Sequence, residues 1–402
     1  MRMRPLIAAL IPALAGMALF VPAMAQSPTL PPYTPAYAPK SGDERDLWMF
    51  SAQFERELAQ SPHLLRDQPL NDYVRRVLCE TVGADRCGAV RIYVLDQPIV
   101  NAGMAANGAM TVWTGLLLRT RSEAELGAVL GHEFAHFELR HGLGGMKEVR
   151  ATMASRETDD GSGKGGSAKQ QREKERALLK SYFRYNRAQE AAADELGLKY
   201  LAASRYPSAA AAWNWQHQIE EADAVAAARA AAGGSSPTAP AEDGEEGFYD
   251  THPSDRQRSA RLTELAAQYD DGNEDPGIAA HYQALKPHMA RLLDGLVQQN
   301  EFGATEYLLK VLAAHKGWDA ELLYARAEMH RMRGADDDFA SAAQYYREAM
   351  AQGLNRPDVY RDLGVSLARA GRKAEARVEL ATYLQLVPNA ADGREMRALM
   401  DP

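Results

Sequence analysis

Two histidines four residues apart, with a glutamate directly after the first, form the sequence HEFAH at residues 132–136. On an α-helix, side chains at positions i and i+4 share one face, so His132 and His136 can reach the same metal ion while Glu133 is held beside it. This pattern is typical of zinc hydrolases, in which the glutamate is the general base. The alternative is an amphipathic helix that contains two histidines and no metal.

The flanking residues predict that this motif lies on a helix. Ser122 and Glu125 have the spacing of a capping box, and an apolar stripe runs from there toward the motif. We therefore expect a helix over residues 123–140, closed by Gly142 and a glycine-rich loop.

A hydrolytic zinc site needs three protein ligands and one open position. His141 lies nine residues after His132, which places it on the opposite helix face, where a partly cationic imidazole would cap the C-terminus. Glu190 is the better third ligand, because Glu190 and Asp194 are again four apart with three alanines between them. Such small residues allow close helix approach, so that Asp194 can brace a ligating histidine. The alternative is a solvated acidic helix face.

The two stretches together resemble a known family. HExxH followed by R-x-x-E-x-x-A-D, here at residues 187–194, resembles the zinc endopeptidase family that includes the HtpX heat-shock peptidases and the CAAX prenyl proteases. The likeness covers residues 43–262 and departs at Asn186, where the family has serine. It implies a zincin-like helical domain with a small β-sheet and one zinc ion per chain. It also implies the roles in the site: Glu133 as base, and His132, His136 and Glu190 as metal ligands.

Five further residues match the family and are expected to orient the ligands or to control access: Asn101, Arg187, Asp194, His252 and Arg258. His252 lies where periplasmic relatives place a histidine near the metal. A neutral imidazole is a good zinc ligand, so His252 could displace the water and keep the enzyme latent. In the alternative, it is a structural histidine that helps Arg258 to fasten its loop.

The chain contains two cysteines, Cys79 and Cys87. In an oxidising compartment, such a pair predicts a disulfide, here between a helix over residues 70–81 and a strand over residues 90–95. Two buried free thiols are the alternative. A second strand is expected near residues 109–114, and residues 109–113 are our candidate for an edge strand that pairs with an extended substrate.

The N-terminus predicts export. Residues 1–25 contain Arg2 and Arg4, an apolar stretch and an A-x-A site, as a signal peptide does; the alternative is a membrane anchor. The residue directly after this site is Gln26 and not a cysteine, which argues against lipid attachment there. No later segment is long and apolar enough to span a bilayer, so we expect no transmembrane anchor after cleavage. Loss of the two arginines changes the formal net charge from −8 to −10, which suits nucleic acid poorly.

The 402 residues have ordinary globular composition, with 46% hydrophobic and 25% charged residues, and are long enough for two domains. After a Pro- and Tyr-rich lead at 26–42, we expect a peptidase domain at 43–275 and a helical repeat domain at 276–402. Two tracts of low complexity, at 159–171 and 230–247, are either lids or segments without function.

The last repeat closely matches a tetratricopeptide repeat, and a looser unit precedes it. Its matching positions are Tyr360, Leu363, Gly364, Leu367, Gly371, Ala376, Leu380, Tyr383 and Pro388. A generic helical bundle is the alternative.

These features predict a mainly α (α+β) protein that acts as an exported zinc endopeptidase on unfolded or misassembled proteins. Signal peptide, peptidase domain and repeats together resemble the periplasmic, β-barrel assembly-enhancing branch of the family. That resemblance implies work on outer-membrane proteins and contact between the repeats and the β-barrel assembly machinery. Two alternatives stay open: a tetratricopeptide chaperone or scaffold with a latent or structural zinc site, and a cell-wall amidase, for which no saccharide-binding module is recognisable.

Overall fold

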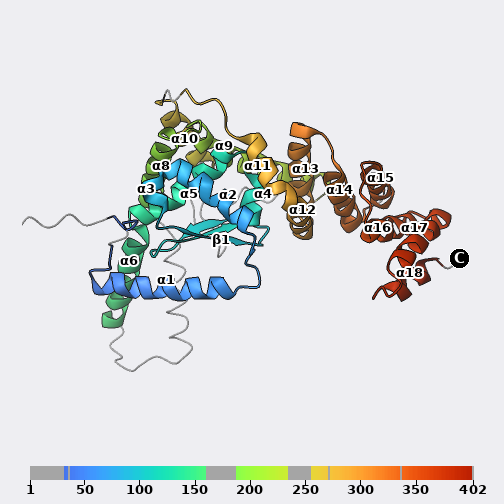
Figure 1. The fold of residues 1–402 in the computed structure, drawn as a ribbon, viewed down its shortest axis with the longest axis horizontal. Coiled ribbons are helices and arrows are strands. Elements are labelled where there is room, and N and C mark those ends of the chain that lie inside the picture. The colour runs from blue at the N-terminus through green and yellow to red at the C-terminus, as the bar shows by residue number, and fades with distance from the viewer. Residues whose placement is uncertain are drawn as a thin grey trace, which may run out of the picture.

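The computed structural model describes residues 31–34, 37–159, 187–233, 255–269, 272–335 and 337–400. These residues are mostly helical and include one small sheet, as the sequence predicts (Figure 1). The first half contains α1 (Gly42–Gln60), α2 (Gln68–Val82), α3 (Ala84–Cys87), β1 (Arg91–Leu95), β2 (Ala102–Met104), β3 (Ala109–Trp113), α4 (Thr114–Arg119), α5 (Glu123–Glu138), α6 (His141–Asp159) and α8 (Arg187–Ala202).

The second half of the described chain is entirely helical. It contains α9 (Ala210–Ala231), α10 (Asp255–Ala266), α11 (Ile278–Leu285), a short 3-10 helix η1 (Lys286–His288), α12 (Met289–Gln298), α13 (Phe302–Lys316), α14 (Ala320–Arg333), α15 (Asp338–Ala351), α16 (Pro357–Arg369), α17 (Lys373–Leu386) and α18 (Gly393–Met400). None of the described helices is long and apolar enough to cross a membrane.

The sheet has the strand order β1-β3-β2, so our prediction of residues 109–113 as an edge strand is wrong. β3 pairs in parallel with β1 on one side and antiparallel with β2 on the other, so both of its edges are occupied. β1 and β2 are the two edge strands of this sheet, and the end of β1 is bonded to a preceding segment, where the Leu65 amide donates to the Val94 carbonyl at 2.9 Å. The sequence did not reveal this, because β2 has three residues and its position depends on pairing with residues farther along the chain.

The sheet lies between α1 and a layer of helices that includes α2 and α5 (Figure 1). On the α1 side, Glu55 accepts hydrogen bonds from Tyr93 on β1 and from Asn107 in the turn before β3, each at 2.7 Å. On the other side, the predicted disulfide is present: Cys79 on α2 is bonded to Cys87 on α3, with Cα atoms 5.2 Å apart. The hydrogen bonds of Glu55 join α1 to the sheet, and the disulfide joins α2 to α3.

α5 and α8 pack closely because glycines line their contact. A Cβ atom at Gly197 of α8 would lie 3.0 Å from the backbone nitrogen of His132 and 3.1 Å from its Cα. These distances are tighter than an ordinary van der Waals contact of carbon atoms, about 3.5–4.0 Å. Gly197 therefore lets the backbone of α8 touch α5 at the start of the HEFAH motif.

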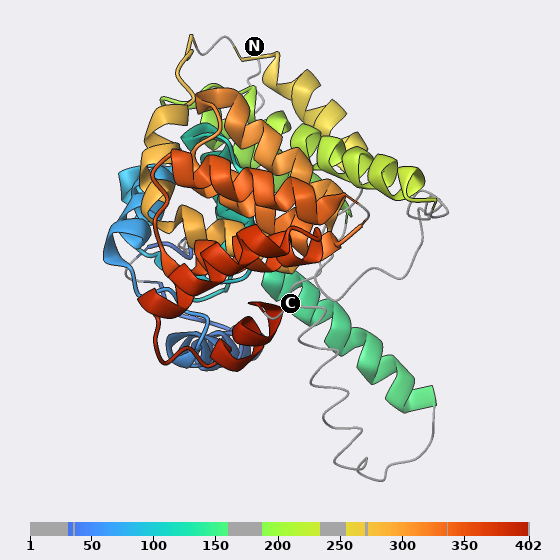
Figure 2. The same ribbon diagram turned by 90° about the vertical axis from the view of Figure 1, so that its right-hand side faces the viewer.

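α5 ends earlier than the sequence predicts. Ser122 caps its N-terminus by accepting a hydrogen bond from the Glu125 amide, but the helix ends at Glu138 rather than at residue 140. Arg140 then adopts a left-handed backbone conformation with φ of 57°, and α6 begins directly at His141 in place of the expected glycine-rich loop. α6 projects from the rest of the molecule (Figure 2).

The apolar core continues across the boundary that we predict at residue 275. Leu285, Leu293 and Leu309, from α11 to α13, belong to the same cluster of buried residues as the helices around HEFAH. From Ala327 onward a separate cluster forms between α14, α15, α16 and α17, which extend away from the peptidase part (Figure 1). Each of these helices packs on the next, as stacked helical repeats do; the assignment as tetratricopeptide repeats stays a prediction.

Candidate metal centre

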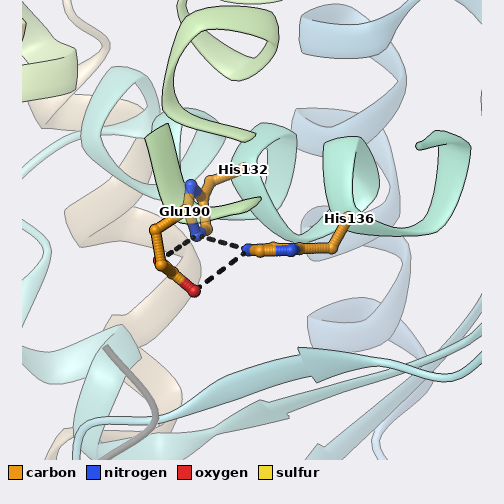
Figure 3. Close-up of side chains that lie close together, drawn as sticks. All are labelled: His132, His136 and Glu190. Carbon is orange, nitrogen blue, oxygen red and sulfur yellow. Dashed lines mark hydrogen bonds and ion pairs between the residues drawn. The ribbon is translucent and has the colours of Figure 1, made fainter. Parts of the chain in front are cut away.

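The three predicted metal ligands converge in the structure. His132 and His136 project from successive turns of α5, and Glu190 projects from the first turn of α8 toward both (Figure 3). The two Nε2 atoms are 3.0 Å apart. Glu190 Oε2 lies 3.5 Å from His132 Nε2, and Glu190 Oε1 lies 3.5 Å from His136 Nε2. All three residues are buried.

These distances fit a tetrahedral zinc site. With metal–ligand bonds of about 2.0–2.1 Å, neighbouring ligand atoms around a tetrahedral ion lie about 3.3 Å apart. The observed separations of 3.0, 3.5 and 3.5 Å lie on both sides of that value, the last two being to different oxygens of the Glu190 carboxylate. Two imidazole nitrogens and a carboxylate oxygen are also a donor set that catalytic zinc uses. The residues therefore fit the ion that the motif implies.

Asp194 and Arg258 brace the ligands from behind. Asp194 Oδ1 lies 3.0 Å from His132 Nδ1, as expected for a carboxylate that orients a ligating histidine. Arg258, on α10, contacts Asp194 at 2.5 Å and Glu190 at 3.2 Å through its guanidinium. The guanidinium carbon lies 3.9 Å from the centre of the Trp215 ring. One buried cation thus holds two carboxylates that come from consecutive turns of α8.

Opposing effects set the pKa values of this cluster. Burial lowers the pKa of His132, but hydrogen bonds and charges from Asp194 and Glu190 outweigh burial and raise that pKa to about 9. Burial raises the pKa of Asp194, yet His132 and Arg258 hold it below its usual range. A histidine must be deprotonated to bind a metal, so an ion that enters this site competes with a proton on His132.

Glu133 lines a cavity of about 210 Å³ together with His132 and Asp194. The side chain is buried, with 4% of its surface exposed. Asn101, which precedes β2, lines the same cavity and accepts a backbone hydrogen bond from Trp113 at 3.0 Å. Much of the wall is apolar: Val100, Leu116, Val129, Leu198, Trp215 and Leu262. The predicted base is therefore next to the predicted ligands, in a space that can receive a side chain.

Our prediction for His141 is wrong. The left-handed residue Arg140 turns the chain back, so His141 Nδ1 lies 2.8 Å from Nδ1 of His136 instead of on the opposite face of α5. Burial lowers the pKa of His141 to about 4, so its ring is neutral at pH 7 and does not act as a cationic helix cap. Helical periodicity could not predict this contact, because the helix is interrupted between His136 and His141.

The remaining predicted residues are outside the buried cluster or outside the described chain. Arg187 is exposed at the start of α8 and is not buried with the ligands. His252, the departure at Asn186 and nearly all of the two low-complexity tracts lie outside the described residues. Trp215 was not anticipated: its contact with Arg258 joins α9 to α10, and no local sequence pattern links two residues so far apart.

Comparison with known proteins agrees with the geometry. Residues 65–266, half of the chain, match the model of peptidase family M48. The chain belongs to peptidase family M48. The matched region includes the ligands, the base and the residues that brace them, so the peptidase domain is the part of the chain for which the family is shown.

Two M48-like relatives match over short segments. The mitochondrial metalloendopeptidase OMA1 of Arabidopsis thaliana is 44% identical over 50 residues, which cover 12% of this chain and 10% of that protein. The human mitochondrial metalloendopeptidase OMA1 is 39% identical over 75 residues, which cover 17% of this chain and 14% of that protein. The chain therefore spans only a small part of the length of these relatives.

Proposed function

We propose that this protein is a zinc-dependent endopeptidase. The observation that carries the proposal is the convergence of His132, His136 and Glu190, with Glu133 and His132 lining one cavity. Family membership and the two metalloendopeptidase relatives support the same activity. A purely structural zinc site has no use for a carboxylate next to an open position, so the intact Glu133 favours catalysis.

The chemistry divides between the ion and the chain. When bound, zinc would lower the pKa of a water molecule and polarise the carbonyl of the scissile peptide bond. Glu133 accepts a proton from the attacking water and delivers it to the departing amide nitrogen. Asp194 keeps the proton of His132 on Nδ1 and leaves Nε2 free for the metal. Arg258 holds Asp194 and Glu190 in place through its two ion pairs.

We propose that substrate binds as an extended strand along β2. Asn101 and Ala105 bond to β3, so by the alternation of an antiparallel pair the amide and carbonyl groups of Ala102 and Met104 face the open edge. Ala102 also lines the cavity that contains Glu133. Pairing through backbone groups requires an unfolded segment and makes few demands on its sequence. The apolar cavity wall favours apolar side chains next to the cleaved bond.

The cellular role is a further proposal that rests on the sequence. The predicted signal peptide at residues 1–25 and the predicted tetratricopeptide repeats resemble the organisation of the periplasmic protease BepA. We propose that the protein is exported to the periplasm, degrades unfolded or misassembled outer-membrane proteins, and contacts the β-barrel assembly machinery through its repeats. The second candidate is a chaperone or scaffold with a latent zinc site; the stacked helices α14–α17 favour a binding role of this kind alongside proteolysis.

Cleavage of an unfolded polypeptide tests the proposed activity. Purified full-length protein should degrade a reduced, alkylated protein substrate, lose this activity with a chelator, and regain it when zinc is added back. The same substrate in its folded form is the control and should resist cleavage. If the zinc-loaded protein binds the unfolded substrate without cleaving it, this result would contradict the proposed endopeptidase activity and favour the chaperone role.

A further inference from the structure

The second ring nitrogen of His136 has a partner of an unusual kind. Histidines that bind metals generally donate the hydrogen of their other ring nitrogen to a carboxylate or a backbone carbonyl. His132 follows this rule, with Asp194 at 3.0 Å from its Nδ1. At His136, the atom 2.8 Å from Nδ1 is instead Nδ1 of another imidazole, that of His141.

The position of the protons follows from the site. His136 Nε2 faces His132 and Glu190, at 3.0 and 3.5 Å, so it is the atom that would bind the metal and must carry no hydrogen. The hydrogen of a neutral His136 is then on Nδ1 and points at His141. His141 Nδ1 must accept this hydrogen bond, which places the hydrogen of His141 on its own Nε2.

The backbone is built to bring His141 to this position. Arg140, the residue before it, has a left-handed backbone conformation that residues other than glycine seldom adopt. Its guanidinium is held on one side by Glu44, at 3.1 Å, and lies over the ring of Tyr37, with the guanidinium carbon 4.8 Å from the ring centre. The turn that presents His141 to His136 is therefore fastened to α1 and to the segment before it.

We propose that His141 is a positioning residue for the metal centre: it accepts a hydrogen bond from His136 Nδ1 and so fixes the tautomer and ring orientation that leave Nε2 free for zinc. The inference rests on the proposed zinc site, but it concerns only what one side chain does to another. Residues that orient a ligand in this way typically contribute about 10- to 100-fold to metal affinity.

Two substitutions at one position separate hydrogen bonding from packing. In His141→Asn, the side-chain oxygen can take the place of Nδ1 and accept the same hydrogen bond, whereas His141→Leu has similar bulk and no acceptor. Zinc affinity is measured by competition with a chromophoric chelator. We expect His141→Asn to bind zinc within about threefold of the wild type, and His141→Leu to bind it about 10- to 100-fold more weakly.

The controls distinguish this role from a structural one. His315→Leu, a matched change of an exposed histidine on α13, should leave zinc affinity unchanged. The thermal midpoints of the wild type and the two His141 variants in excess chelator should agree, because the effect acts on metal binding. Equal zinc affinity of His141→Leu and wild type, or an equal loss in both His141 variants, would overturn the inference. Failure of the wild type itself to bind zinc would instead overturn the proposed function.

Discussion

Helices approach one another closely both at the metal centre and in the C-terminal stack, but different residues fill the contacts. Between α5, α8 and α10, buried charged groups converge, and one arginine, Arg258, neutralises two carboxylates. Between α14 and α17, the apolar core consists of alanine, leucine, valine and tyrosine, with Ala342, Tyr346 and Leu363 fully buried. In the first region, close packing fixes the positions of polar groups. In the second region, burial of apolar side chains stabilises the fold. Substitutions should therefore affect metal binding in the first region and only stability in the second.

The largest contrast is expected between two buried carboxylates. Glu190→Ala removes a ligand. Loss of a residue that only orients a ligand lowers metal affinity by up to about 100-fold, so zinc affinity should fall further than this. Asp338→Ala, in the C-terminal region, removes the partner of Arg333 and His330, at 2.6 and 2.7 Å. It should cost about 1–3 kcal/mol of stability and leave zinc affinity unchanged. Zinc titration and chemical unfolding of both variants measure this; equal zinc affinities would remove the distinction.

Two glycines provide a matched test of packing. In Gly197→Ala the new Cβ would meet the backbone of His132 at 3.0 Å, whereas in Gly364→Ala it would meet the Leu380 side chain at 2.7 Å. Each change should cost about 1–3 kcal/mol, since both overfill a helix contact. Only Gly197→Ala should also lower zinc affinity, because it moves α8 and Glu190 away from α5. Unchanged zinc binding in that variant would show that the helix spacing is not what sets the ligand geometry.

Much of the metal centre could be predicted from the sequence because its signals are local. Spacing of four residues placed His132 with His136 and Glu190 with Asp194, and a cap residue located the start of α5. Contacts that depend on a break in a helix or on distant pairing could not be found in this way. His141 reaches His136 through the left-handed Arg140, and the edge position of β2 depends on pairing with β3. A helical period or a strand pattern contains no information on either.

The disulfide should stabilise the peptidase region specifically. Cys79 and Cys87 close a loop with a sequence separation of eight residues, for which chain entropy gives roughly 2 to 3 kcal/mol. Reduction should lower the free energy of unfolding of that region by about this amount, while the far-ultraviolet signal of the C-terminal helices persists to the same denaturant concentration. A Cys79→Ala/Cys87→Ala double variant is the control and should not respond to reductant. No response in the wild type would contradict the expectation.

A further expected effect concerns pH. The pKa of His132 is raised from 6.5 to about 9, so its proton stabilises the zinc-free fold below about pH 6.5, and this contribution is lost as the pH rises through about 9. Zinc affinity has the opposite sign: displacement of one proton predicts a rise of about tenfold per pH unit between pH 7 and 9. Isothermal titration in buffers of different ionisation enthalpy counts the released proton. Affinity that is constant across this range would argue against a protonated His132.

Glu133→Gln tests the central claim most directly, because it removes the base and keeps every proposed ligand. The measurement is zinc content by mass spectrometry together with cleavage of an unfolded polypeptide, for this variant and the wild type side by side. Both proteins should contain about one zinc per chain, and the variant should cleave at least about 100-fold more slowly. Cleavage by Glu133→Gln at the wild-type rate, with zinc still bound, would contradict the assignment of Glu133 as the base in a zinc endopeptidase.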